Sequence, residues 1–150
     1  MAWATHLFGF TGRFRRRDFW YVYILLNFYR LATFLIAAAI DSDPSSSANQ
    51  IATFVLMVPA TFSIIAAIVK RLHDLDIGGR WLAAYGVLVA LTITAWAIIE
   101  HALKFTGGVA FAIEAPLLAP TILVGVWWGF KIQFFRGTEG DNRFGPNPLA

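Results

Sequence analysis

Long apolar runs alternate with short polar connectors along the chain. Four runs are each close to the roughly 20 helical residues that cross a bilayer, and they lie at residues 20–40, 51–69, 81–99 and 111–132. They are apolar on all sides, without the stripe of a surface helix or the alternation of a half-buried strand. Backbone groups in lipid must satisfy one another's hydrogen bonds, so we expect these runs to be α-helices. The pattern predicts an all-α polytopic membrane protein, with four transmembrane helices in a bundle and a single domain over residues 1–150.

Composition supports the membrane class. Hydrophobic residues make up 58% of the 150 residues and charged residues only 14%, whereas a soluble domain carries about 25% charged residues. The chain has no cysteine, which excludes disulfides, iron–sulfur clusters and thiolate zinc sites. We expect no cofactor.

Basic residues gather in alternate connectors. Four of the twelve Lys and Arg precede the first run, three lie in 70–80 and three lie at 131–143, which makes ten. The connector 41–50 has none, the connector 100–108 has Lys104 alone, and Arg30 lies inside the first run. The positive-inside rule then places the flanks 1–19, 70–80 and 133–150, and so both termini, in the cytoplasm. This imbalance explains the basic charge without a nucleic-acid partner, and the usual nucleic-acid-binding motifs are absent.

The flank before the first run interleaves phenylalanines with arginines (FGFTGRFRRRDFW). Aromatic rings and guanidinium groups together suit the headgroup zone of a membrane. If the segment is helical beyond Gly12, then Arg13, Arg16, Arg17 and Trp20 share one face. That face could bind phosphate bidentately. The alternative is a topology signal with no ligand.

The connector 70–80 (KRLHDLDIGGR) concentrates charge between two apolar runs. His73 and Asp74 are adjacent, as in some metal sites and hydrolases, but the other histidines are only His6 and His101. Their spacing matches no strong ligand motif. We therefore expect no metal site and no catalytic residue. In the alternative role, Asp74 accepts hydrogen bonds from a neighbouring arginine or from helix-end amides.

Three motifs in this order resemble a family of small bacterial inner-membrane proteins, domain of unknown function 805. They are Phe10-x-Gly12-Arg13-x-x-Arg16-x-x-Phe19-Trp20, Arg71-x-His73-Asp74, and Gly137-x-x-Gly140-x-Asn142-x-Phe144-Gly145-x-Asn147-Pro148. The second departs from the family pattern at Asp76, Gly78 and Arg80. The resemblance covers nearly the whole chain. It implies a four-span protein of the bacterial inner membrane and no established activity.

The three motifs all fall on the predicted cytoplasmic side, so we expect them to meet in one polar cap. The cap either binds an anionic lipid headgroup or locks the loops to the helix ends. The residues predicted to form this network are Arg13, Arg16, Arg71, His73, Asp74 and Asn142. The function favoured by this layout is a non-catalytic protein that binds lipid or protein partners through its cap. Other membrane proteins or a second copy of the chain are the possible protein partners.

Apart from Lys131 at the inner end of the fourth run, two charged residues lie inside the runs. Arg30 lies near mid-membrane, where a charge costs about 3 kcal/mol, so we expect it to face the bundle. Glu114 lies near the outer end of the fourth run, and helical side chains lean toward their own N-terminus, so direct pairing with Arg30 looks strained. A water-filled pocket or carbonyls freed by proline could serve Arg30 instead. A polar pathway at Arg30 would indicate a small transporter or channel, and a single satisfied arginine is the structural alternative.

Overall fold

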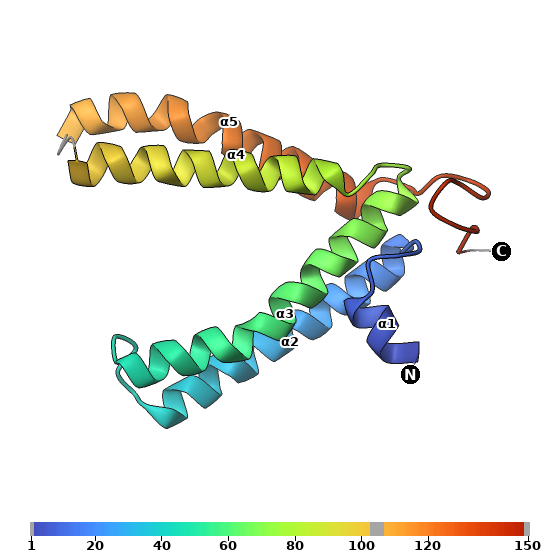
Figure 1. Cartoon of the computed structure of the whole chain (residues 1–150), viewed down its shortest axis with the longest axis horizontal. Coiled ribbons are helices and arrows are strands. Elements are labelled where there is room, and N and C mark those ends of the chain that lie inside the picture. The colour runs from blue at the N-terminus through green and yellow to red at the C-terminus, as the bar shows by residue number, and fades with distance from the viewer. Residues whose placement is uncertain (1, 103–106, 149–150) are drawn as a thin grey trace. The chain divides into compact units, whose positions relative to one another are not determined.

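The computed structural model describes residues 2–102 and 107–148, with side chains described for 5–101 and 112–148. Its elements are α1 (Ala2–Phe8), α2 (Arg16–Ile40), α3 (Ser47–Asp74), α4 (Arg80–Ala97), a π-helical turn (Ile98–Ala102) and α5 (Gly107–Phe134), as Figure 1 shows. In this part of the chain there is no strand, only an isolated bridge between Asn142 and Gly145. Four of the helices are long and apolar enough to span a membrane. The predictions of an all-α fold and of four helices able to span a membrane are confirmed for this part of the chain.

The helices α2 and α3 extend beyond their apolar runs into charged residues. α2 begins at Arg16 and α3 ends at Asp74, so both continue into the charged flanks. The prediction that Arg13 shares a helical face with Arg16, Arg17 and Trp20 is wrong, because Arg13 precedes the first residue of α2. Gly12 has a φ of +86°, and Phe14 N–H donates to the Lys70 carbonyl at 3.0 Å, which holds the segment against α3. Lys104, the single cation of its connector, lies outside the described residues.

The structure divides into two compact units, Met1–Ile77 with Arg136–Ala150, and Gly78–Phe135. The first unit is built on the hairpin of α2 and α3, with α1 packed on α3. The buried stripe of α2 faces small residues of α3, which allow the helices to approach closely. The stripe is Phe19, Val22, Leu26, Thr33 and Ala37, and the α3 residues are Ala60, Ser63, Ala66 and Ala67. The single four-helix bundle stays a prediction.

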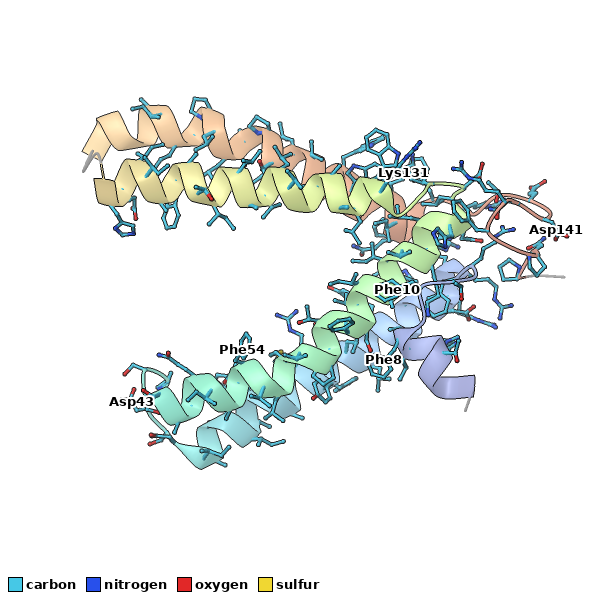
Figure 2. The ribbon with its side chains drawn as sticks, viewed as in Figure 1. Phe8, Phe10, Asp43, Phe54, Lys131 and Asp141 are labelled. Carbon is cyan, nitrogen blue, oxygen red and sulfur yellow. The ribbon has the colours of Figure 1, made fainter. Side chains whose placement is uncertain are left out.

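Large apolar side chains cover the outside of this hairpin. Phe54 stands out from α3 and is 73% exposed, as expected for a side chain that faces lipid (Figure 2). The same figure places Asp43 at the connector between α2 and α3, at the opposite end from the C-terminus of α3. The hairpin thus has an apolar exterior between two polar ends.

Side-chain hydrogen bonds shape the connector between α2 and α3. Asp43 N–H donates to Asp41 Oδ1 at 3.0 Å, and the hydroxyl and N–H of Ser45 donate to Asp43 Oδ1 at 2.7 and 2.9 Å. These donors lower the pKa of both aspartates, because they stabilise the ionised carboxylates. Ser46 caps α3 by accepting from Asn49 N–H at 3.1 Å, and the buried Asn49 amide donates to two carbonyls near the end of α2. The turn is therefore fixed by polar groups in a chain that is otherwise apolar.

The second unit is the pair α4 and α5. The hydroxyls of Thr92 and Thr121 are 2.8 Å apart, and Tyr85 donates to the Thr121 carbonyl at 3.3 Å. Gly125 leaves space for the tyrosine, because a Cβ there would overlap its hydroxyl and lie 3.2 Å from Cζ. Polar contacts of this kind hold helices together in lipid, where apolar surface gives no preference for one neighbour over another.

Candidate functional site

A buried polar cluster joins three segments of the first unit: the stretch before α2, the C-terminal end of α3 and the tail after residue 136. We call it the polar cap. Its members are Arg13, Arg71, His73, Asp74, Thr138 and Asn142. Five of the six residues predicted from the motifs are in this cluster, and the sixth, Arg16, lies beside it. The predicted role of the network stays a prediction.

Asp74 is the centre of the polar cap. Arg13 Nη2 lies 3.1 Å from Asp74 Oδ1, and Arg71 Nη1 pairs with the other carboxylate oxygen, Oδ2. The side chains of the two arginines are only 1% and 0% exposed, and that of Asp74 is 6% exposed. Two guanidinium groups therefore share one carboxylate away from water. The arrangement requires further acceptors, because a single carboxylate cannot balance the charge of two guanidinium groups.

Backbone oxygens supply those acceptors to Arg13. Its Nη atoms donate to the carbonyls of Thr138 at 2.8 Å, Gly140 at 2.7 Å and Gly145 at 3.4 Å, and to the Thr138 hydroxyl at 3.1 Å. Arg71 donates to the Phe14 carbonyl at 3.4 Å. The donors of Arg13 are thus directed at groups within the protein, and Arg13 serves to bind the tail rather than an external anion.

The tail closes the C-terminal end of α3. Thr138 N–H donates to the Asp74 carbonyl at 2.8 Å, and the Asn142 side chain donates to the His73 carbonyl at 2.9 Å. Carbonyls at a helix end have no partner within the helix, so these bonds satisfy them. Gly137 makes the approach possible, because a Cβ at this position would overlap the Asp74 carboxylate.

His73 is held between two segments. Its Nδ1 lies 3.1 Å from the Gly12 carbonyl, and its ring stacks on Phe144 with centroids 4.0 Å apart. Across the described side chains, no three His, Cys, Asp or Glu residues are grouped so that they could hold a metal ion. The contacts of the histidine join the first and third motifs.

A further buried cation, Lys70, anchors α1. The Lys70 ammonium donates to the His6 carbonyl and lies 4.0 Å from the centre of the Phe14 ring. The residue is 2% exposed. Cation–π contact and the carbonyl bond together replace water around the charge. This role of Lys70 is not predictable from the sequence, because a lysine at the end of an apolar run is equally well explained as a topology signal.

A groove of about 470 Å³ opens beside the polar cap, and we call it the cationic groove. Four arginines line it, namely Arg15, Arg16, Arg17 and Arg136, and its acidic lining residues are Asp74 and Glu139. Asp74 is already paired with two arginines of the cap, and Arg15 Nε pairs with Asp18 at 2.9 Å. Arg17 and Arg136 are exposed, with no hydrogen bond or ion pair to any described residue. The groove therefore carries an excess of positive charge.

The first turn of α2 adds to this charge. The N-cap residue Arg15 makes no side-chain capping bond, and the N-terminus of a helix carries a partial positive charge. The sequence predicts that the arginine run lies in the headgroup zone, but it does not predict that Arg136 joins this run. Arg136 lies beside the run because Gly137 and Thr138 hold the tail against α3. No pattern in the sequence predicts that contact.

Arg30 and Glu114, the charged residues predicted to lie within the membrane, belong to different units. Arg30 lines a groove of about 320 Å³ between α2 and α3, and no hydrogen bond or ion pair to a described residue is formed by its side chain. Glu114 belongs to α5, and its Oε1 atom is buried with no hydrogen-bond partner among the described residues. The side chain of Arg30 is exposed at this groove, and the expectation that it faces the bundle stays a prediction.

Comparison with known proteins gives one family and close relatives of no known activity. The family described as protein of unknown function DUF805 matches residues 7–146. The uncharacterized protein YiiR of Escherichia coli strain K12 is 34% identical over 142 residues, which cover 93% of this chain and 85% of that protein. YiiR of Escherichia coli O157:H7 has the same identity and coverage. No solved structure matches the chain significantly.

Proposed function

We propose a function for this chain, which belongs to the DUF805 family of proteins of unknown function: it is a non-catalytic membrane protein that binds anionic lipid headgroups in its cationic groove. It resides in the bacterial inner membrane, with the polar cap and both termini on the cytoplasmic side. The observation that carries the proposal is the pair Arg17 and Arg136, which line the groove without a partner among the described residues.

The position of the groove suits a lipid headgroup. It lies at the N-terminal end of α2, a helix of 25 residues that is long enough to span a bilayer. Charged side chains at such an end meet the phosphate layer, where each Lys or Arg contributes about 1 kcal/mol of attraction to an anionic surface. A volume of about 470 Å³ is in the range of small-molecule sites, roughly 300–1,000 Å³. It can hold one headgroup.

Guanidinium chemistry favours phosphate as the ligand group. An arginine presents two parallel N–H groups that match two oxygens of a phosphate, and the amides of a helix N-terminus favour an anion as well. The polar cap plays a supporting part, since Asp74 holds the backbone of Gly137 and Thr138 and so positions Arg136. This assignment moves the predicted lipid contact from Arg13 and Arg71 to the neighbouring arginines.

Native mass spectrometry of the full-length protein tests the proposal. Protein in neutral detergent is exposed to equal amounts of phosphatidylglycerol and phosphatidylcholine, and retention of each lipid is measured. We expect the wild type to prefer phosphatidylglycerol, and Arg17→Gln with Arg136→Gln to weaken that preference at least about tenfold.

Arg80→Gln is the matched control, because Arg80 is exposed, lies outside the groove and has no described partner. It removes one charge but should retain the lipid. A double variant that elutes as folded protein and binds phosphatidylglycerol as well as the wild type does would refute the proposal.

A small transporter or channel is the second candidate. The observation in its favour is the groove at Arg30, which places a charge beside open space within a candidate span. This function predicts anion flux across liposomes that contain the protein, with loss of that flux in Arg30→Gln. The lipid-binding function predicts no such flux.

A further inference from the structure

Arg30 occupies a position that normally holds an apolar residue. The buried stripe of α2 includes Leu26 and Thr33, and Arg30 lies four residues after the first and three before the second. Residues with this spacing share one helix face. Ala60 of α3 is buried opposite this face and lines the same groove. Arg30 is itself exposed, so its guanidinium group lies at the open side of the helix seam, where the groove begins, while the rest of the stripe packs against small side chains.

The groove around Arg30 is polar on one side and apolar on the other. Tyr23 and Asn27 precede Arg30 along the same face of α2, and Leu26, Met57 and Ile64 line the remainder with Ala60 and Thr61. Asn27 donates to the Tyr23 carbonyl at 2.7 Å, and the Thr61 hydroxyl donates to the Met57 carbonyl at 2.9 Å. These bonds engage the Thr61 hydroxyl and one N–H of Asn27. The guanidinium donors have no partner among the described residues, so they can meet a ligand.

The charge on Arg30 is permanent and lies deep in the helix. An arginine side chain does not lose its proton in proteins, and Arg30 is fourteen residues beyond the start of α2, which corresponds to about 21 Å along the axis. The lining of its groove contains no Asp or Glu. Charges within a bilayer face the protein interior or a polar cavity and pair with an opposite charge. The groove therefore supplies the space for a counter-ion but not the counter-ion itself.

We propose that this groove binds the oxyanion of an acyl-chain amphiphile, a carboxylate or a phosphate, as the counter-ion of Arg30. The groove volume of about 320 Å³ holds such a headgroup but not a whole lipid. The acyl chain then lies along the apolar exterior of the hairpin, where large side chains are exposed. The site shares no lining residue with the cationic groove and does not depend on the function proposed for it.

The chemistry of the site predicts that the charge of the ligand headgroup, and not the acyl chain, determines the selectivity of binding. A guanidinium and an oxyanion form two parallel, charge-assisted hydrogen bonds, and low dielectric strengthens the attraction. A neutral amphiphile with the same chain gains only the apolar contacts. Oleate should therefore bind more tightly than oleyl alcohol, although the two differ only at the headgroup.

Displacement of a fluorescent fatty acid from the full-length protein in neutral detergent tests this site. Oleate and phosphatidic acid are the two anionic competitors, and they distinguish a carboxylate source from a phosphate source. We expect one or both to displace the probe from the wild type at least about tenfold better than oleyl alcohol does. Arg30→Gln should lower the affinity for the effective competitor by about the same factor.

Three further variants make the outcome decisive. Arg80→Gln and the Arg17→Gln, Arg136→Gln double variant should bind the competitor as the wild type does, which separates this site from the cationic groove. Arg30→Lys keeps the charge without the paired donors and should bind with intermediate affinity, and it replaces Arg30→Gln if that variant does not fold. Equal displacement by oleyl alcohol, or binding that is unaffected by substitution of Arg30, would overturn the proposal.

Discussion

At the scale of single residues, the polar cap depends on one buried carboxylate. Asp74 pairs with both Arg13 and Arg71, whose side chains are almost completely removed from water. Removing one partner of a buried ion pair strongly lowers the stability of the folded protein. The remaining charge is then buried without water and without a counter-charge. Substitution of Asp74 should therefore destabilise the whole polar cap.

Asp74→Asn should destabilise the protein by roughly 3–5 kcal/mol. The amide keeps the shape of the side chain but leaves two buried guanidinium groups without a negative charge. The thermal unfolding temperature in detergent, followed by gel filtration of heated samples, measures the effect. Asp76→Asn is the matched control: its pair with Arg143 is exposed, with side chains 47% and 59% accessible, and exposed pairs contribute about 0–1 kcal/mol. Equal unfolding temperatures for the two variants would contradict this account.

The sequence predicted most members of the cap but not their partners. Arg13, His73 and Asn142 stood out because they belong to motifs, whereas Thr138 carried no signal. Its contact with Asp74 joins residues 64 positions apart. Such contacts depend on how the tail folds back, which no periodic pattern encodes. The overlap that would follow a Cβ at Gly137 is likewise visible only in three dimensions.

At the scale of elements, apolar runs located the helices but not their ends. α2 and α3 continue into charged flanks because arginine and lysine are good helix formers and need no lipid. α1 has only seven residues, too few to show a helical period. The polar contacts between α4 and α5 were missed for another reason: Thr92 and Thr121 are ordinary residues within their runs, and only their pairing distinguishes them.

Gly125→Ala should weaken the pairing of α4 and α5. The added methyl group displaces the Tyr85 hydroxyl and breaks its bond to Thr121, at a cost of about 0.5–1.5 kcal/mol. Thermal unfolding in detergent again reports the change. Gly129→Ala should be neutral or slightly stabilising. The nearest atom to the new Cβ would be Nε2 of Gln133 at 3.9 Å, which is an ordinary van der Waals contact, and alanine is the better helix former.

A second substitution identifies the cause. Tyr85→Phe removes the hydroxyl that the methyl group would meet, so Gly125→Ala should cost less in that background than in the wild type. Additive effects of the two substitutions would mean that the loss arises elsewhere.

At the scale of the whole molecule, charge separates the two ends of the α2–α3 hairpin. One end carries the polar cap and the cationic groove, and the other carries a connector with Asp41 and Asp43 and no Lys or Arg. The four apolar runs correspond to four helices that are long and apolar enough to cross a membrane. The orientation in the membrane is a prediction that rests on the positive-inside rule.

Cysteine labelling in intact cells tests the orientation, because the natural chain contains no cysteine. Ser45→Cys in the α2–α3 connector should react with a maleimide that does not cross the inner membrane. Glu139→Cys beside the cationic groove should react only after the membrane is opened. Both positions are exposed, so a difference between them reports topology rather than burial. Labelling of both sites from outside would contradict the assignment.

The Arg13 site also has a consequence for biogenesis. Arg13 leaves the ribosome before any of the four spans, whereas the oxygens of Thr138, Gly140 and Gly145 that surround it are synthesised after all of them. Membrane insertion of the apolar segments therefore precedes closure of this site. A nascent polypeptide interrupted at residue 136 retains every hydrophobic helix, yet its guanidinium lacks those acceptors. Successful integration into the bilayer is then no measure of completed folding.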